Sequence, residues 1–321
     1  MITTGQPHST PLAEAARLMR SFDVARLKNE LAEVAGYRWQ PQRIHDAGGV
    51  GESAAIDWRV LPLRSPGGDG DRTDPGGPGP VDFAPTRWLN RLPYLREILN
   101  GIPAPLNAVR LMALGPGAVS TPHRDPKYAL HRGLMRLHIP IVTQPGAVLV
   151  LDGVEHCWQP GEFWYGDFSR EHLVRNTGPT TRVHAVVDAL LTHELSKLFP
   201  SDWQGAFSDA DVLFNRPTIE ADLGPTALTR TADIPEGFTD FGDEQSLDGP
   251  LQPTTISLTA QRPMLTTEER VFALVWVGPA EYRFAGWSEQ RTLQLTDDVV
   301  VLRVRHGRTL AERTLPATAT Q

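Results

Sequence analysis

The feature that most constrains the fold is a series of short apolar runs between residues 108 and 191. The runs are Val109–Leu114, Met135–Val142, Ala147–Leu151, Glu162–Tyr165 and Arg182–Leu191. Turn residues such as Gly-Pro-Gly at 115–117 and Gln-Pro-Gly at 144–146 and 159–161 separate them. Strands at this short, regular spacing indicate a sandwich or barrel rather than a βαβ fold. We therefore expect a mainly β chain with a double-stranded β-helix core, the jelly roll of cupin-like proteins.

Two helices are expected beside this core. Asp23 is placed to cap a helix over Val24–Val34, whose Leu27, Leu31 and Val34 share one face, and a second helical segment covers Tyr94–Leu99. Ala15–Phe22 and Trp58–Leu63 read as strands. The stretch from Ser65 to Pro80 is almost all Gly, Pro, Asp and Ser, and predicts a mobile surface loop.

The chain divides into three expected parts. Residues 1–200 form the jelly-roll domain, residues 201–261 a linker or helical extension, and residues 262–321 a small C-terminal α+β module of unknown role. The module is expected to combine a short helix at Thr-Thr-Glu-Glu-Arg (266–270) with strands over Thr292–Leu295 and Val299–Val304.

Composition limits the partners and the compartment. A net charge of −7 argues against nucleic acid and anionic membrane surfaces, both of which reward a basic face. No stretch reaches 18 uninterrupted apolar residues, and the single cysteine, Cys157, cannot form an internal disulfide. We expect a cytoplasmic protein without nucleic-acid or membrane partners; the sequence leaves its oligomeric state open.

Three residues in the strand-rich region have the composition of a metal site. His123 and Asp125 lie in Thr-Pro-His-Arg-Asp-Pro, and His172 lies in Ser-Arg-Glu-His. Two imidazoles and a carboxylate on one face of an ion make the facial triad of non-haem Fe(II) oxygenases, which leaves positions open for co-substrate and O₂. Residues two apart in a strand or strand exit point the same way, so both donors of His-x-Asp can face one metal.

His-x-Asp alone is a weak signal, and its neighbours strengthen it. Arg182 lies ten residues after His172, across a Thr-Gly-Pro turn, so it can sit on the next antiparallel strand beside the metal. A guanidinium there suits the distal carboxylate of 2-oxoglutarate, which it can bind with two hydrogen bonds. Arg136 and His138 form another pair two residues apart that can face the same cavity.

The segment from about Arg110 to Leu195 resembles the aspartyl/asparaginyl β-hydroxylase family, Fe(II)/2-oxoglutarate dioxygenases related to bacterial proline hydroxylases. The resemblance rests on the Pro-Gly turn before His123, Arg-Leu-His-Ile-Pro (136–140), Gly-Glu-Phe-Trp (161–164), Phe-Ser-Arg-Glu-His (168–172) and the strand from Arg182 to Asp188. It implies that His123 and His172 bind iron and that Arg182 holds 2-oxoglutarate. It also implies that Arg136 and His138 contact the other end of 2-oxoglutarate or the substrate.

Two positions depart from the family pattern. Peptide aspartyl hydroxylases of the family lack the carboxylate that Asp125 supplies here, which looks more like the proline-hydroxylase branch. A serine that the family uses near 2-oxoglutarate appears as Met112. Related halogenases replace the carboxylate with a small residue, so an intact Asp125 favours hydroxylation or desaturation.

The expected function is a dioxygenase that uses Fe(II), 2-oxoglutarate and O₂ to hydroxylate an Asp- or Asn-type β-carbon in a peptide or peptide natural product. One alternative is a hydroxylase of a free amino acid such as proline. An alternative of another class is a cupin-like metal-binding module without oxygenase activity, which would bind metal without turning over 2-oxoglutarate.

Overall fold

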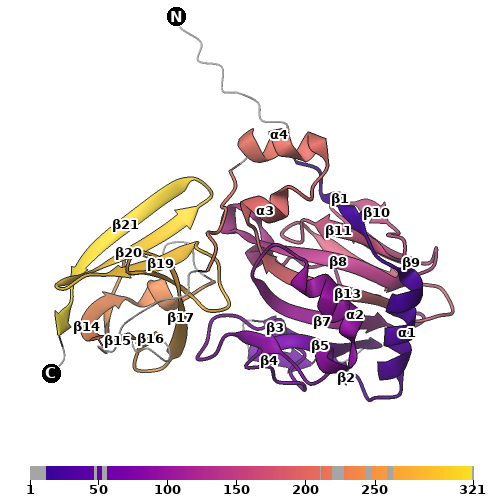
Figure 1. Ribbon diagram of the computed structural model, residues 1–321, viewed down its shortest axis with the longest axis horizontal. Helices are drawn as coiled ribbons and strands as arrows, with labels where there is room; N and C mark the ends of the chain where they lie inside the picture. Colours follow the sequence, from indigo (N-terminus) through magenta and orange to yellow (C-terminus); the bar gives the residue numbers. More distant parts are fainter. Residues whose placement is uncertain are drawn as a thin grey trace, which may run out of the picture.

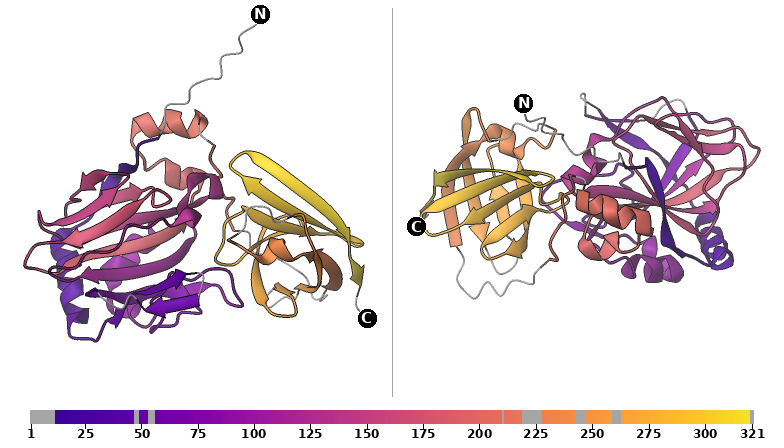
Figure 2. Two further views of the ribbon diagram at one scale, coloured as in Figure 1. Left: turned by 180° about the vertical axis from the view of Figure 1, so that it is seen from behind. Right: turned by 90° about the horizontal axis from the view of Figure 1, so that it is seen from above.

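The computed structural model describes residues 12–46, 49–52, 56–209, 211–218, 228–242, 247–258 and 263–319. These residues form two lobes that lie side by side, a barrel lobe followed by an appended β lobe (Figures 1 and 2).

Two sheets build the barrel lobe. The larger has the strand order β1-β11-β8-β13-β7-β5-β2 with β6 on β5, and the smaller has the order β10-β9-β12. The strands are β1 (Ala15–Ser21), β2 (Gln40–Pro41), β5 (Trp58–Pro66), β6 (Phe83–Pro85), β7 (Leu106–Leu114), β8 (Leu134–Val142), β9 (Ala147–Leu151), β10 (Val154–His156), β11 (Glu162–Gly166), β12 (His172–Asn176) and β13 (Arg182–Leu190). A separate hairpin joins β3 (Arg43–Asp46) and β4 (Gly49–Glu52). The mainly β, jelly-roll prediction is confirmed.

Helices cover one face of the larger sheet. Helix α1 (Val24–Ala35) begins at Asp23, whose Oδ1 accepts hydrogen bonds from the backbone N–H groups of Ala25 and Arg26, as the sequence predicted. Helix α2 (Pro93–Asn100) follows the 3₁₀ turn η1 (Leu89–Arg91). Apolar side chains of both helices share one core with alternate residues of the central strands: Leu27, Val34, Leu95, Ile98, Val109, Leu111, Leu137, Ile139, Ala185 and Val187.

Because strand side chains alternate between faces, the other residues of these strands point away from the helices, toward the smaller sheet. On β7, β8 and β13 this inner face carries Arg110, Arg136, His138, Arg182, His184 and Asp188, all buried. A buried sheet face of this polarity is unusual for a packed core and marks the interior of the barrel as the place to look for chemistry.

The barrel lobe continues past residue 200. Helices α3 (His193–Ser196) and α4 (Ser201–Asp209) follow β13, and Trp203 and Phe207 of α4 join the same apolar core. The 3₁₀ turns η2 (Pro126–Tyr128) and η3 (Leu130–Arg132) lie between β7 and β8.

The appended lobe is one curled sheet with the order β21-β20-β19-β18-β17-β16-β15-β14-β22. Its strands are β14 (Leu228–Pro235), β15 (Leu251–Leu258), β16 (Met264–Thr266), β17 (Val271–Gly278), β18 (Glu281–Phe284), β19 (Arg291–Leu295), β20 (Val299–His306), β21 (Thr309–Pro316) and β22 (Thr318–Ala319). Since β22 directly follows β21 and pairs with β14, the sheet curls back on itself. Phe241, Phe272, Phe284 and Trp287 pack edge to face inside it, and Phe238 packs at a tilt against Phe284.

Two expectations for this lobe are wrong. Residues 266–270 form the turn between β16 and β17 rather than a helix, because Thr267 closes it with hydrogen bonds to Arg270. Among the described residues of the lobe, the one helical element is the 3₁₀ turn η4 (Glu236–Thr239), so the lobe is β rather than α+β. Strands β14 and β15 fall within residues 201–261, the segment expected to be a linker or helical extension, and they pair with the later strands.

The Gly- and Pro-rich stretch after β5 is a packed connection, against the expectation of a mobile loop. Asp74 accepts hydrogen bonds from the Arg72 side chain and from the Gly76 N–H. Lys127 Nζ donates to the Gly76 carbonyl at 3.1 Å, and the Ala273 N–H of the appended lobe donates to Gly79 at 2.7 Å. Backbone polar groups, rather than apolar side chains, hold this segment between the two lobes.

Candidate metal centre

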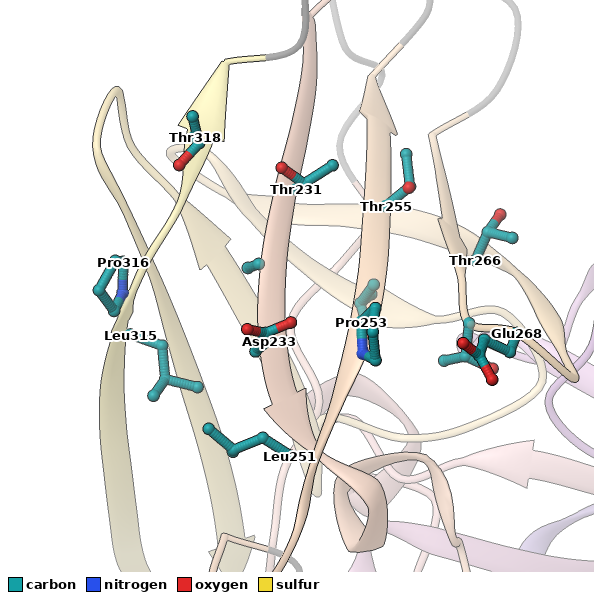
Figure 3. Close-up of a pocket in the computed structure, with 13 residues that line it drawn as sticks. Thr231, Asp233, Leu251, Pro253, Thr255, Thr266, Glu268, Leu315, Pro316 and Thr318 are labelled. Atoms are coloured by element: carbon teal, nitrogen blue, oxygen red, sulfur yellow. The ribbon is translucent and has the colours of Figure 1, made fainter.

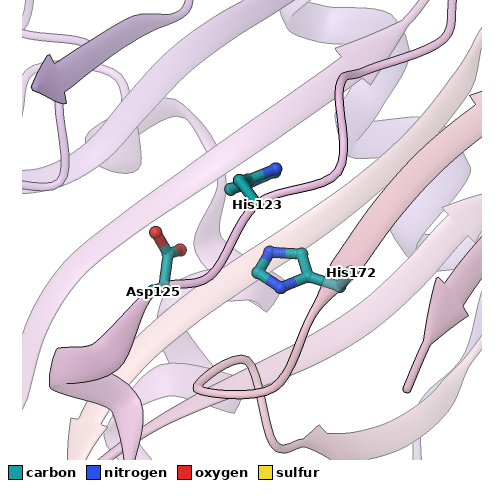
Figure 4. A group of neighbouring side chains, drawn as sticks. All are labelled: His123, Asp125 and His172. Carbon is teal, nitrogen blue, oxygen red and sulfur yellow. The ribbon is translucent and has the colours of Figure 1, made fainter.

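Two reciprocal backbone hydrogen bonds place the predicted histidines side by side. The His123 N–H donates to the His172 carbonyl at 3.0 Å, and the His172 N–H donates to the His123 carbonyl at 2.9 Å. Directly opposite residues of an antiparallel pair project to the same face, and the two imidazole centroids are 4.2 Å apart. Asp125 follows two residues later, and one donor atom from each of the three residues lies within 4.8 Å of the others (Figure 4).

Both imidazoles are oriented for binding through Nε2. Nδ1 of His123 is 2.9 Å from the Thr121 carbonyl, and Nδ1 of His172 is 2.9 Å from the Arg170 carbonyl. A carbonyl can only accept, so each Nδ1 carries the proton and each Nε2 lone pair is free, as metal-ligating histidines require. Burial lowers the pKa of His172 to about 4, which keeps its imidazole neutral at physiological pH.

A buried ion network holds the third donor. Arg136 donates from Nη1 to Asp125 Oδ2 at 2.6 Å, and its Nε and Nη2 donate to the two oxygens of Asp188 at 2.8 and 3.2 Å. The Tyr128 hydroxyl donates to Asp188 Oδ2 at 2.6 Å. Burial raises the pKa of Asp125, but Arg136 and the neighbouring histidines outweigh this effect and leave that pKa below its ordinary value. The carboxylate is therefore ionised, with one oxygen held by Arg136 and the other available to a cation.

Arg182 is buried at the start of β13 and, among the described residues, forms no ion pair with a carboxylate. Its Nη2 donates to Nδ1 of His184 at 2.9 Å, which makes that imidazole nitrogen an acceptor. His138 Nδ1 lies 3.3 Å from the same atom. Burial lowers the pKa of Arg182 to about 10, and burial together with Arg182 lowers the pKa values of His138 and His184 well below their ordinary value.

The structure corrects one part of the expected arrangement. Strand β13 does not pair with β12, which carries His172, but lies between β7 and β8 in the larger sheet. The turn at Thr177–Thr181 carries the chain from one sheet to the other, where Asn176 donates to the Thr180 carbonyl at 2.8 Å. Arg182 and His172 therefore belong to opposite walls of the barrel.

Several residues of this interior were not predicted to act in it. Asp188 and Tyr128 anchor Arg136, His184 accepts from Arg182, and Arg110 lies buried on β7. Their signal in the sequence is spacing: Arg182, His184 and Asp188 alternate along one strand. That signal identifies a shared face, but it does not tell which partner each residue has.

A groove of about 540 Å³ lies elsewhere, on the appended lobe (Figure 3). Threonines of β14, β15, β16 and β22 line it together with Asp233 and Glu268, and the lining includes none of the barrel residues described above.

A model of the aspartyl/asparaginyl β-hydroxylase family matches residues 21–191, more than half of the chain. The chain belongs to this family. It is accordingly a hydroxylase of the 2-oxoglutarate-dependent class, and the resemblance noted from the sequence is confirmed. The match lies within the barrel lobe and ends before the appended lobe.

Comparison with solved structures gives distant similarities. An oxidoreductase of the 2OG-Fe(II) oxygenase family from Burkholderia pseudomallei is 14% identical over 52% of this chain and 80% of its own, with a TM-score of 0.35. A prolyl hydroxylase from Trichoplax adhaerens, in complex with a hypoxia-inducible-factor peptide fragment, is 10% identical over 55% and 83%, with a TM-score of 0.37. A cupin domain from Bordetella pertussis is 20% identical over 28% and 86%, with a TM-score of 0.22. No curated protein sequence matches the chain.

Within the described residues, no helix has the length and apolar character needed to cross a membrane.

Proposed function

We propose that the protein is an Fe(II)- and 2-oxoglutarate-dependent dioxygenase that hydroxylates an Asp- or Asn-type β-carbon of an amino-acid residue in a peptide or peptide natural product. Family membership supports the reaction class. The observation that carries the proposal is Arg182, a buried guanidinium without an acidic partner among the described residues, on the wall opposite the His123–Asp125–His172 cluster. A metal-binding module alone has no need of such an anion receptor.

The donor set fits the proposed metal. Two neutral imidazoles and one carboxylate match the facial triad of non-haem Fe(II) enzymes, and both Nε2 atoms have free lone pairs. When bound, Fe(II) activates O₂ with oxidative decarboxylation of 2-oxoglutarate, giving succinate, CO₂ and one oxygen atom inserted into a substrate C–H bond.

The remaining roles fall to side chains of this chain. Arg182 binds the distal carboxylate of 2-oxoglutarate, and His184 orients Arg182 through its Nδ1 acceptor. Arg136 fixes the Asp125 ligand and is itself held by Asp188, while His138 faces the co-substrate or the substrate. Phe168 stacks on His138 and packs edge-on against His172, so an apolar side chain excludes water next to the metal.

Substrate oxidation is the direct test. Purified protein is incubated aerobically with Fe(II), 2-oxoglutarate and a panel of Asp-, Asn- and Pro-containing peptides and free amino acids, and succinate and product mass are measured. We expect succinate release to rise with one panel member, which gains one oxygen atom. A free amino acid as the preferred substrate would select the alternative substrate class, while metal binding without any succinate would support the cupin-like module instead.

A further inference from the structure

Arg110 is a buried cation whose side-chain donors are not all used. It lies on β7 and is 1% exposed, and its Nε and Nη2 atoms form no hydrogen bond with the described residues. It forms an ion pair with Asp188, with Nη2 at 3.5 Å from Oδ2. A buried guanidinium with free donors is costly, so such a group in a folded enzyme indicates an anion that it binds.

Asp188 cannot fully satisfy Arg110. Both Asp188 oxygens already accept hydrogen bonds from Arg136, and Oδ2 accepts another from the Tyr128 hydroxyl. Lys127 adds a third nearby positive charge, while Asp125, the other carboxylate of this cluster, is a proposed metal ligand. Burial lowers the pKa of Arg110; Asp188 raises it but does not restore the ordinary value, and the adjacent Arg136 lowers it. The cluster therefore has more positive charge than the protein's own acids compensate.

The position of Arg110 separates it from the proposed 2-oxoglutarate receptor. Arg110 on β7 and His138 on β8 both lie opposite Val186 of β13, so the two side chains flank Val186 on the inner face. Arg182 is four residues further along β13, about 13 Å at the usual rise of a strand. In the proposed complex, Arg182 takes the distal carboxylate of 2-oxoglutarate and the metal takes the other end. The anion at Arg110 is then a third one, which belongs to the substrate.

We infer that Arg110 is a specificity-determining residue that binds a carboxylate of the substrate inside the barrel. This inference rests on the proposed function and narrows it: the preferred substrate carries a side-chain carboxylate, as aspartate does, rather than the corresponding amide. The His138 Nε2 atom beside it also lacks a hydrogen-bond partner among the described residues. Because His138 Nδ1 faces the acceptor Nδ1 of His184, Nε2 can accept a hydrogen bond from an N–H group of the same ligand but cannot donate one to its carboxylate.

Matched acid and amide ligands test the inference without turnover. Calorimetry is performed on protein loaded with Mn(II), with and without saturating 2-oxoglutarate. The titrants are L-aspartate against L-asparagine, L-glutamate against L-glutamine, and the N-acetyl methylamides of aspartate and asparagine. We expect at least one acid to bind at least tenfold more tightly than its amide. If no acid in the panel binds more tightly than its amide, the inference is wrong.

Three variants test whether Arg110 is the residue that distinguishes an acid from its amide. Arg110→Gln should abolish the acid preference, Arg110→Lys should retain part of it, and Arg124→Gln, which removes an exposed guanidinium next to the metal ligands, should keep all of it. The affinity for 2-oxoglutarate should be unchanged in all three, which also shows that each variant is folded. An acid preference that survives Arg110→Gln contradicts the inference, and so does an equal loss of 2-oxoglutarate binding. If Mn(II)-loaded wild-type protein binds no 2-oxoglutarate, the proposed function fails. The acid–amide comparison in the absence of 2-oxoglutarate still tests whether Arg110 binds a carboxylate.

Discussion

Arg136 donates a hydrogen bond of 2.6 Å to Asp125 while Asp188 holds it from the other side at 2.8 Å. The orientation of a proposed metal ligand thus depends on a carboxylate near the end of β13. Groups behind the ligands of a metal site set ligand geometry and basicity, and losing one typically lowers metal affinity about 10–100-fold.

Asp188→Asn is expected to weaken metal binding through this network. The amide cannot balance Arg136, which is then free to turn away from Asp125, and we expect an affinity loss of about 10-fold. Titration with Mn(II) or Co(II) measures it. Asp71→Asn, which breaks an exposed ion pair with Arg87, is the matched control. Unchanged metal affinity in Asp188→Asn would show that Arg136 does not position the ligand.

Asp125→Ala should have a larger effect than Asp188→Asn because it removes the proposed ligand itself. We expect metal affinity to fall by more than about 100-fold and iron-dependent turnover to be lost. Full activity in this variant would mean that Asp125 is not a ligand and that the protein works with two histidines alone.

Arg182→Ala should strongly weaken co-substrate binding while metal binding persists. A bidentate, charge-assisted contact in a buried site contributes enough that its loss should weaken 2-oxoglutarate binding on the order of 100-fold or more. His184→Phe, which removes only the acceptor of Arg182, should cost about 10-fold. Calorimetry on Mn(II)-loaded protein checks both variants against Arg175→Ala, a change at a more exposed arginine paired with Glu155. Equal 2-oxoglutarate affinity in Arg182→Ala and wild type would remove the main support for the oxygenase.

Lys127 is expected to make the stability of the folded protein depend on pH. Burial lowers its pKa from 10.5 to about 8 in the folded protein. Between these values the unfolded chain binds a proton that the folded chain does not, so stability should rise with pH through this window. In metal-free protein, Lys127→Met should lose that rise, while Lys197→Met, a change at an exposed lysine, should keep it. Tm is measured for the three proteins from pH 7 to about 10.5. Identical profiles of Tm against pH for wild type and Lys127→Met would contradict this prediction.

Asn215 tests how tightly the lobes are joined. Its Nδ2 donates to Gly133 and Leu191 of the barrel lobe at 2.7 and 2.9 Å, and its Oδ1 accepts from the Glu289 N–H of the appended lobe at 2.8 Å. Asn215→Ala leaves the buried Glu289 N–H without a partner, while the Gly133 and Leu191 carbonyls each keep one backbone hydrogen bond, and we expect a loss of about 2 kcal/mol in unfolding free energy. The control is Asn90→Ala, which removes one exposed contact to Arg96. A loss no larger than in the control would show that the lobes are only loosely associated.

The barrel could be predicted from the sequence because short stretches of the chain specify its strands and turns. Apolar alternation, turn residues and the Asp23 cap each act over a few positions, and β7, β8, β9, β11 and β13 follow them. The appended lobe was harder, because β14 and β15 are rich in threonine and become recognisable only through pairing with later strands. The Gly- and Pro-rich connection was misjudged for a related reason: distant groups such as Lys127 and Ala273 hold it by its backbone.

Residue identity and spacing were enough to predict the cluster of His123, Asp125 and His172. Strand geometry orients His123 and Asp125 to the same side, and a second strand supplies His172. Spacing could not predict that Arg136 would be shared between Asp125 and Asp188, or that Arg182 and His172 would lie on different sheets. Both depend on which strands pair across the barrel, and the sequence of one strand does not specify its partners.

The most direct test of the central claim is anaerobic optical titration of metal-free protein with Fe(II) and then 2-oxoglutarate. Chelation of Fe(II) by 2-oxoglutarate should produce a weak visible charge-transfer band in the wild type. The band should be absent in His172→Ala and weakened in Arg182→Ala. A wild-type protein that binds Fe(II) but develops no band on addition of 2-oxoglutarate would contradict the dioxygenase account.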